Sequence, residues 1–302
     1  MTYHRAAVLG SPIQHSLSPV LHNAAYRALG LTGWEYDKRE ISQEDLHDFF
    51  SSLNPQWAGV SMTMPLKKKA LEFGEIADER VRHLKVANTA VFDWDKPNPY
   101  NPNMPYIALY NTDVDGIKLT FRDEFGVEDT SKPHTSALIL GSGSTATSSI
   151  AALIELGVHR FTICAIHHDS AVAIATKMHA YANAQSTFTI MPWHSAINEF
   201  SRHNFAVSAV TAHATDTLAH ELECADEHDI KLDHLSMLDV IYDPRPTALM
   251  SVLAQRGAQV CGGEHMLLRQ AIAQIAYMTK YSEADVESQA FAAMKSALFE
   301  QL

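Results

Sequence analysis

The segment Ala137–Ala146, with the sequence Ala-Leu-Ile-Leu-Gly-Ser-Gly-Ser-Thr-Ala, decides the fold expected of this chain. Its apolar half, Ala137–Leu140, is typical of a buried strand, and Gly141 and Gly143 predict a tight turn before a helix that runs to Leu156. A strand, a glycine-rich turn and a helix form the opening unit of dinucleotide-binding folds. Many strand–helix turns carry two glycines, so this segment alone leaves nucleotide binding open.

The turn and the first helical residues are the predicted cofactor contacts. The backbone amides of Ser142–Thr145 would face a pyrophosphate at the N-terminus of the helix. Ala146 stands where the dinucleotide fingerprint has its third glycine, and a residue this small still allows close helix–strand packing. The predicted contacts are therefore Gly141, Ser142, Gly143, Ser144, Thr145 and Ala146.

Strands and helices alternate along the chain that follows. Strands are expected at Arg160–Ile166, Thr187–Met191, Phe205–Val210 and Met237–Tyr242, and a helix at Ser170–Ala182. This alternation predicts a parallel, doubly wound sheet.

The residues before the turn predict a further α/β region. Its strands are expected at Ala6–Gly10, Trp34–Glu40 and Ala58–Met64, and its helices at Ser18–Gly30, Ser42–Leu53, Leu66–Phe73 and Val114–Phe125. The segment Asp93–Pro105 is rich in Pro and Asn and lacks apolar periodicity, so a surface loop is expected there. A long amphipathic helix is expected at Gly263–Lys280.

Length and charge set limits on the function. A chain of 302 residues with 46% apolar and 19% charged residues is typical of a globular protein of about two domains. The formal net charge of −12 argues against a nucleic-acid partner, since phosphate backbones require a basic face. It leaves room for a small anionic substrate, because local groups decide binding of that kind.

No segment predicts a membrane span, a signal peptide or a metal site. The chain has no run of about 18 uncharged apolar residues, and its N-terminus leads directly into an apolar strand, so we expect a cytoplasmic protein. Cys164, Cys224 and Cys261 show neither metal-ligand spacing nor a disulfide framework. The 17 histidines include no pair at metalloprotease spacing, so surface and helix-end use is expected for them.

Lys67 and Asp113 are the predicted catalytic pair. Lys67 ends the string Val60–Lys67, and Asp113 lies in Asn-Thr-Asp-Val-Asp-Gly. An ammonium can give and take a proton, and a carboxylate can hold it in place. The alternative is that Lys67–Lys69 form one solvated basic face, and that Asn88 and Asp113 serve turn or cap chemistry at strand ends.

Ser16 and Ser18 are two hydroxyls within the string His-Ser-Leu-Ser-Pro, just before a helix. With the helix N-terminus behind them, they suit a carboxylate ligand. Ser18 could equally be no more than a helix cap. The residues alone do not decide between these two roles.

Taken together, these strings resemble the shikimate dehydrogenase family over nearly the whole chain. The family pattern opens with G-x-P-x-x-H-S-x-S-P, which matches Gly10–Pro19. Its N-V-T-x-P-x-K string is echoed by Ser61–Lys67. Ala87–Thr89 resembles the A-x-N-T string in a partly displaced form. The remaining matches are Asn111–Gly116 to N-T-D-x-x-G, Asp239–Leu249 to D-x-x-Y-x-P-x-x-T-x-L, and Gly263–Ala271 to G-x-x-M-L-x-x-Q-A.

The resemblance implies a role for each matched residue. Lys67 and Asp113 would be the catalytic pair, and Ser16 and Ser18 would bind the substrate carboxylate. Gly263 would lie at the cofactor. The implied substrate contacts are Ser16, Ser18, Thr63, Asn88, Asp113, Tyr242 and Gln270.

Three positions depart from the family pattern. Ser61 replaces the usual Asn, and Glu264 stands where the family often has an apolar residue. After the second strand of the cofactor domain the family often has Asn-Arg-Thr, whose arginine holds the 2′-phosphate of NADP. Here the chain reads Ile166-His167-His168-Asp169, so His167 is the implied cofactor contact and the choice between NADP and NAD stays open.

The resemblance implies a two-lobed α/β protein that reduces 3-dehydroshikimate to shikimate with NADP or NAD, in the pathway to chorismate and the aromatic amino acids. Residues 1–112 and 263–302 would form the substrate domain, and residues 113–262 a Rossmann-type cofactor domain. The alternatives are an NAD-preferring quinate/shikimate dehydrogenase and a catalytically silent metabolite-binding relative. Whether the chain is a monomer or a homodimer is not predicted.

Overall fold

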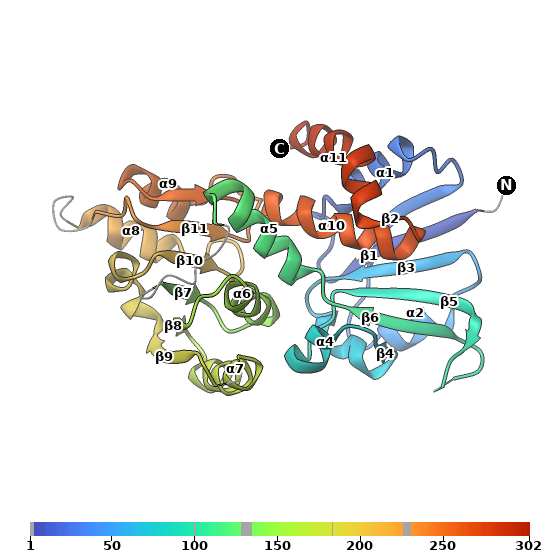
Figure 1. The fold of residues 1–302 in the computed structure, drawn as a ribbon, viewed down its shortest axis with the longest axis horizontal. Coiled ribbons are helices and arrows are strands. Elements are labelled where there is room, and N and C mark those ends of the chain that lie inside the picture. Colours follow the sequence, from blue (N-terminus) through green and yellow to red (C-terminus); the bar gives the residue numbers. More distant parts are fainter. Residues whose placement is uncertain (1–2, 100, 128–134, 183, 226–230) are drawn as a thin grey trace. The chain divides into compact units, whose positions relative to one another are not determined.

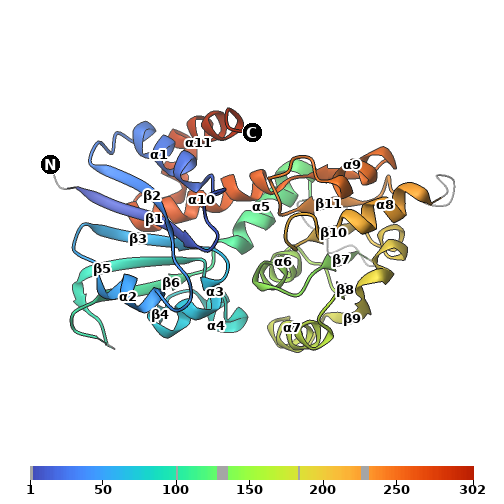
Figure 2. The same ribbon diagram turned by 180° about the vertical axis from the view of Figure 1, so that it is seen from behind.

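The computed structural model describes residues 3–99, 101–127, 135–182, 184–225 and 231–302. By its internal contacts the chain forms two compact units (Figures 1 and 2). The first unit consists of Met1–Thr112 and Leu267–Leu302, and the second of Asp113–Met266. The roles of substrate domain and cofactor domain stay predictions for these units.

The first unit is built on a mixed six-stranded sheet of order β2-β1-β3-β5-β6-β4. Strand β1 pairs in parallel with β2 and β3, whereas β5 runs antiparallel to both β3 and β6. The strands are β1 (His4–Gly10), β2 (Trp34–Glu40), β3 (Trp57–Met62), β4 (Glu75–Ile76), β5 (Thr89–Pro97) and β6 (Pro105–Tyr110).

Alternating residues of β1 supply the two cores of this unit. Ala6 and Val8 pack with helices α1, α10 and α11, whereas Ala7 and Leu9 pack with the shorter helices on the opposite face. This is the period of two that a strand requires when both of its faces are covered. The helices are α1 (Ser18–Ala28), α2 (Leu46–Ser51), α3 (Leu66–Lys69), the 3₁₀ helix η1 (Ala70–Glu72), α4 (Glu79–Leu84), α10 (Gly263–Thr279) and α11 (Glu283–Phe299).

The second unit is built on a six-stranded sheet of order β12-β11-β10-β7-β8-β9, in which the pairings between the described strands are all parallel. This is the strand order of the Rossmann fold, with the reversal between β7 and β10, and it confirms the predicted doubly wound sheet. The strands are β7 (Ser136–Leu140), β8 (Arg160–Ala165), β9 (Thr187–Pro192), β10 (Phe205–Ser208), β11 (Ser236–Asp239) and β12 (Gln259–Cys261).

Helices cover this sheet on both faces, as Figure 2 shows for α6 and α8. On one face, Leu138 and Leu140 of β7 share a buried core with residues of α8 and α9. The helices are α5 (Asp113–Phe125), α6 (Ser144–Glu155), α7 (His168–Tyr181), η2 (Trp193–Asn198), η3 (Phe200–Arg202), α8 (Asp216–Cys224) and α9 (Ala248–Gln255).

The expected surface loop at Asp93–Pro105 is wrong in its first part. Strand β5 continues to Pro97, and Asp93 pairs with Tyr106 of β6. Trp94 secures this stretch because its indole N–H donates to the carbonyl of Trp57, 2.8 Å away. Tertiary pairing thus outweighs the low strand propensity of the local sequence.

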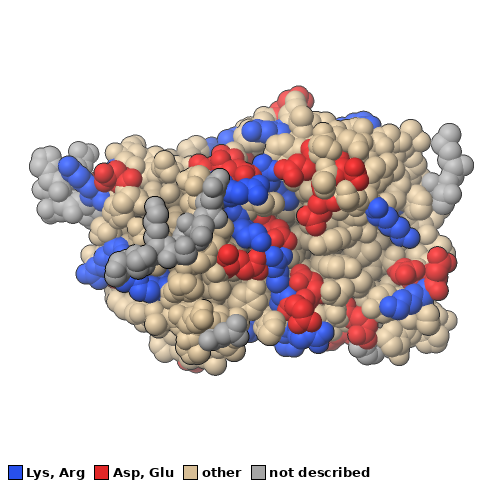
Figure 3. All heavy atoms as spheres, in the orientation of Figure 1, with Lys and Arg blue, Asp and Glu red and all other residues tan. Residues whose placement is uncertain are grey.

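Among the described residues, no helix is long and apolar enough to cross a membrane, and no group of three or more His, Cys, Asp or Glu residues could hold a metal ion. Figure 3 shows acidic and basic side chains intermixed on the face in view.

Candidate functional site

Gly141 makes the turn at the carboxyl end of β7. Its φ of +108° lies in the region that favours glycine, and an added Cβ would lie 2.7 Å from the carbonyl oxygen of Ala209. Both observations exclude larger residues, since the turn needs this backbone conformation and has no room beside β10. The glycine therefore brings the chain directly from the central strand to the start of α6.

The N-terminus of α6 suits an anionic ligand. Its N-cap is Gly143, which gives no side-chain hydrogen bond, so the first amides of the helix have no side-chain cap. A Cβ added at Gly143 would meet nothing within 4 Å, whereas Ala146 is fully buried. Open space in front of uncapped amides, with a small residue packed behind, fits the pyrophosphate of a dinucleotide.

The end of β8 is exposed and lacks a basic side chain with a permanent charge. Ile166, His167 and Asp169 are all exposed, and Ile166 is 72% accessible. His167 is the N-cap of α7, and no Lys or Arg occurs between residues 161 and 176. This is the strand end at which a Rossmann fold reads the adenosine ribose, so the arginine that would hold a 2′-phosphate is missing from it.

The first turn of α10 carries a buried ion pair. Glu264 is 2% exposed, and its Oε1 lies 2.9 Å from Nε of Arg245. Gly263 is required here because an added Cβ would lie 2.0 Å from the carbonyl oxygen of Val240, at the end of β11. The negative charge of Glu264, which departs from the family pattern, is therefore paired with an arginine of the same unit.

A buried carboxylate lies at the end of β11. Asp239 accepts hydrogen bonds from the Thr247 hydroxyl at 2.9 Å and from the Ile241 amide at 3.2 Å. Burial raises the pKa of Asp239, and the charge of Glu264 adds to the effect. These bonds fold the loop that carries Tyr242, which is itself partly exposed.

Ser16 and Ser18 lie at the start of α1, with 8% and 4% exposure. The N-cap of α1 is Leu17, and Ser18 is the first helical residue with Pro19 behind it, so Ser18 is not the helix cap. The Ser18 amide instead faces the Ser16 hydroxyl oxygen, 3.4 Å away. Both serines thus stay candidates for ligand binding.

Lys67 is half-buried in the short helix α3, beside an exposed Lys68. Its carbonyl accepts from the amide of Ala87 at 2.9 Å, which ties α3 to the segment before Asn88. Lys69 forms a 2.7 Å ion pair with Glu72. The three lysines therefore have different environments and do not form one solvated face.

Thr63 and Asp113 are each fixed by backbone structure. The Thr63 amide donates to the carbonyl of Leu9 at 2.9 Å, and an added Cβ at Gly10 would lie 2.5 Å from its methyl group. Asp113 is the first residue of α5 and only 2% exposed. A carboxylate is favoured at this helix end by the helix dipole.

Asn88 and Gln270 lie in direct contact. The amide Nδ2 of Asn88 donates to Oε1 of Gln270 and to the hydroxyl of Thr112, both at 2.9 Å. Gln270 comes from α10 and Asn88 from the residue before β5, so the fold brings together two predicted substrate contacts 182 positions apart.

The sequence motifs missed the groups behind this contact. Gln274, one turn after Gln270, donates to it at 3.2 Å and also contacts Ser61, at 2.9 Å. The spacing of four residues between the two glutamines on one helix was the signal that could have found Gln274.

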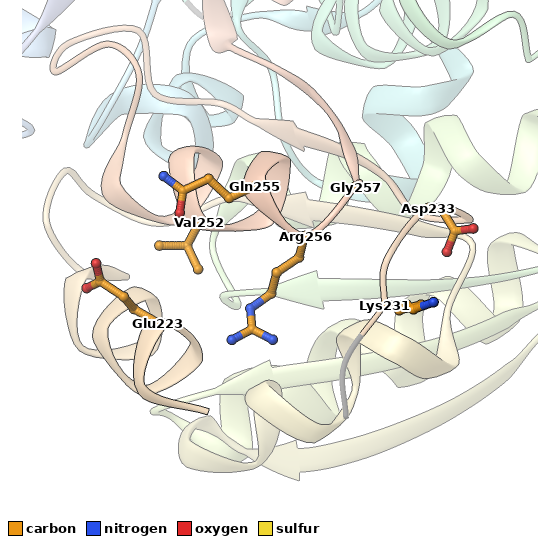
Figure 4. A pocket seen from close by; sticks show the side chains of 7 residues that line it. All are labelled: Glu223, Lys231, Asp233, Val252, Gln255, Arg256 and Gly257. Carbon is orange, nitrogen blue, oxygen red and sulfur yellow. The ribbon is translucent and has the colours of Figure 1, made fainter. Parts of the chain in front are cut away.

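A cavity of ≈ 380 Å³ lies away from these residues, in the second unit (Figure 4). Lys231 and Asp233 precede β11, and Gly257 precedes β12, so these lining residues lie at the amino ends of the parallel strands. Ligands of open α/β sheets bind at the carboxyl ends. We therefore do not assign this cavity to the cofactor.

Known proteins resemble the chain over its full length. The sequence profile of the shikimate dehydrogenase substrate binding domain matches residues 8–90. The Mycobacterium tuberculosis shikimate dehydrogenase structure is 32% identical with a TM-score of 0.78, and covers 98% of this chain and 99% of its own. For the shikimate 5-dehydrogenase of Mycobacterium fortuitum the identity is 34%, the TM-score 0.74 and the coverage 98% and 97%.

A curated relative from Afipia carboxidovorans, named shikimate dehydrogenase (NADP(+)), is 28% identical over 88% of each chain. The likeness to the two mycobacterial structures extends over both units. The chain belongs to the shikimate dehydrogenase family.

Proposed function

We propose that this protein is a shikimate dehydrogenase that reversibly reduces 3-dehydroshikimate to shikimate with a nicotinamide dinucleotide. The observation that carries the proposal is the full-length likeness to shikimate dehydrogenases, in a chain that keeps both Lys67 and Asp113. A catalytically silent relative would have no need of that proton-transfer pair.

In the proposed mechanism, Lys67 handles the proton. During reduction its ammonium donates a proton to the carbonyl oxygen at C3, and during oxidation its amine takes the hydroxyl proton back. Such a positioned acid–base group is typically worth about 10²–10⁴-fold in rate. When bound, the nicotinamide supplies or accepts the hydride. Asp113 holds the ammonium and stabilises its charge.

The other matched residues are proposed to bind and orient the substrate. Ser16 and Ser18 take its carboxylate, supported by their place at the start of α1, where the helix dipole favours an anion. Thr63, Asn88, Tyr242 and Gln270 contact the ring and its hydroxyls. Burial of Asn88 and Gln270 supports this role, since amides held in place lose little freedom on binding.

The cofactor is proposed to bind along the carboxyl ends of β7 and β8. The residues assigned to it are Gly141, Ser142, Gly143, Ser144, Thr145 and Ala146 in the turn, His167 after β8, and Gly263 before Glu264. The uncapped start of α6 supports the pyrophosphate position.

A second candidate is an NAD-preferring quinate/shikimate dehydrogenase. The exposed segment after β8 favours it, because His167 and His168 replace the arginine expected for a 2′-phosphate, and Asp169 adds a negative charge. A histidine ring lacks the permanent charge and the planar fork of donors with which a guanidinium holds a phosphate.

Steady-state oxidation of shikimate and quinate, each with NADP and with NAD, separates these functions. Turnover of shikimate is expected, with quinate a poorer substrate. A preference for quinate with NAD would instead establish the second candidate. Tight binding of shikimate without turnover in any combination would refute both and favour a silent relative.

A further inference from the structure

A buried chain of side-chain hydrogen bonds leads from the Asn88–Gln270 contact into the core of the first unit. We call it the amide network. All of its members are 9% exposed or less. They are His22, Tyr36, Ser61, Asn88, Thr89, Thr112, Gln270 and Gln274.

A backbone amide sets the orientation of the first side chain. The amide of Thr112 donates to the side chain of Asn88 at 2.8 Å, so the atom facing it must be the oxygen Oδ1. The nitrogen Nδ2 of Asn88 then faces Gln270 at 2.9 Å. Because Nδ2 can only donate, the Gln270 atom that it meets must be Oε1.

Gln274 fixes the same orientation from the other side. Its Nε2 donates to Gln270 Oε1 at 3.2 Å and to the hydroxyl of Thr89 at 3.1 Å. Gln270 Oε1 thus accepts from Asn88 and from Gln274. Within the described part of the chain, the side-chain hydrogen bonds of Gln270 all end on Oε1, so Nε2 is the polar atom left for a ligand.

The oxygen of the Gln274 amide also has fixed hydrogen-bond partners. Its Oε1 accepts from the hydroxyl of Ser61 at 2.9 Å and faces Nε2 of His22 at 3.3 Å. The hydroxyl oxygen of Ser61 accepts a hydrogen bond from the hydroxyl of Tyr36 at 2.7 Å. The hydroxyl hydrogen of Ser61 is therefore the one donated to Gln274. A reversed Gln274 amide would lose these contacts and would set its oxygen against that of Gln270.

We propose that Gln274 is a positioning residue that locks the amide of Gln270 with its NH₂ group toward the substrate. The site then offers a donor at this position, which selects an acceptor oxygen on the substrate and disfavours a group that can only donate. This inference rests on the proposed function, which places Gln270 on the substrate. It also gives Ser61 a role, since Ser61 holds the amide of Gln274.

Gln274→Met tests the proposal, because methionine keeps the length of the side chain and removes all four hydrogen-bonding positions. Without Gln274, Gln270 Oε1 keeps only the bond from Asn88 among its two amide donors, so the amide turns its oxygen toward the substrate more often. The expected result is a KM for shikimate roughly 3- to 10-fold higher, the effect of one neutral hydrogen bond. The turnover number and the cofactor KM should stay within about 2-fold of the wild-type values, because the lost bond stabilises the bound substrate and the transition state equally.

Thr279→Val is the matched control on the same helix. Thr279 bonds only its own helix and the Tyr281 amide, with its hydroxyl 2.6 Å from the Ile275 carbonyl, and lies outside the amide network. It should leave the KM for shikimate unchanged. An unchanged KM in Gln274→Met would overturn the proposal, as would an equal rise in the control.

Gln274→Glu adds a pH dependence of the KM for shikimate that a merely structural role of Gln274 would not produce. A carboxylate at this position can only accept, so it would draw the NH₂ group of Gln270 toward itself, in competition with the Asn88 donor that holds Oε1, and would turn Oε1 toward the substrate. Burial raises the pKa of such a carboxyl, so the protonated form is favoured at low pH. The ratio of variant to wild-type KM should therefore rise with pH, and a constant ratio would contradict the lock.

Failure of the proposed function would look different from failure of this inference. If the wild-type protein oxidises neither shikimate nor quinate, the proposed function is wrong, and Gln270 has no substrate to orient. If the wild type turns shikimate over and both Gln274 variants keep its KM at every pH, the function stands and the role of Gln274 is refuted.

Discussion

His22 shows at the scale of one residue how burial changes the chemistry of a side chain. It is fully buried, its ring stacks on Tyr36 at 3.8 Å, and its Nδ1 has no hydrogen-bond partner within the described residues. Burial lowers the pKa of His22 to about 3 from the usual 6.5, only partly opposed by its bond to Gln274. The ring is therefore neutral in the folded protein, with its hydrogen on Nε2, where Gln274 requires a donor.

This shift predicts a loss of stability in acid. Between pH 6.5 and 3 the unfolded chain binds a proton at His22 and the folded chain does not, so the free energy of unfolding falls as pH falls. The slope from this group is about 1.4 kcal/mol per pH unit. Above pH 6.5 His22 is neutral in both the folded and the unfolded chain, so it causes no loss of stability there.

Urea unfolding of the wild type and of His22→Gln at pH 7.5 and pH 5 measures this effect. The variant cannot titrate at this position, so its stability should fall by about 2 kcal/mol less between the two pH values. His203, whose pKa burial also lowers, contributes equally to both proteins. An identical fall in the two proteins would show that His22 does not carry this acid sensitivity.

The start of α10 illustrates the same dependence on partners at the scale of an element. Glu264 is 2% exposed and Arg245 is 34% exposed, so the carboxylate of the pair is buried and the guanidinium is partly exposed to solvent. Arg245→Met should lower the free energy of unfolding by about 1–3 kcal/mol, less than for a fully buried pair, because water reaches the arginine. The midpoint of urea unfolding measures it.

A second substitution checks the cause. In Arg245→Met combined with Glu264→Gln, no buried charge is left unpaired, and much of the lost stability should return. A double variant that loses the sum of the two single effects would argue against an ion pair and for simple loss of packing.

Elements with a strong local pattern could be predicted from the sequence, and elements formed by tertiary pairing could not. Strand β2 was predicted at Trp34–Glu40 and lies there, and the turn after β7 follows from Gly141 and Gly143. In contrast, β5 extends into a segment rich in Pro and Asn, because this part of the strand pairs with β6 and Trp94 bonds the carbonyl of Trp57. The expected helix Ser42–Leu53 contracts to Leu46–Ser51, since Ser42 bonds Asp45 in a turn before it.

The candidate site likewise contains residues that sequence motifs predicted and residues that only the fold brings together. The motifs named Asn88 and Gln270, but nothing in them pointed to Gln274, His22 or Tyr36. Those groups come from α10, α1 and β2, and only the folded chain brings them together. Ser61, which departs from the family pattern, takes part in these contacts, because its hydroxyl bonds both Tyr36 and the Gln274 amide.

At the scale of the whole molecule, each of the two units matches a separate requirement of the proposed reaction. The second unit has the Rossmann strand order, with an uncapped helix at the central strand. The first unit holds Lys67 and the amide network. An enzyme of this kind must bind a dinucleotide and orient a polar ring, and the proposed contacts to the ring also include Asp113 and Tyr242 of the second unit.

In the proposed reaction the chain transfers a hydride between shikimate and the nicotinamide, with Lys67 as the proton-transfer group. Steady-state oxidation of shikimate by the wild type and by Lys67→Met examines this role, with Lys68→Met as the control at an exposed lysine next to it. We expect turnover by the wild type and by the control, and about 10²–10⁴-fold lower kcat in Lys67→Met with shikimate KM within about 3-fold. Full turnover by Lys67→Met would show that Lys67 is not the proton-transfer group.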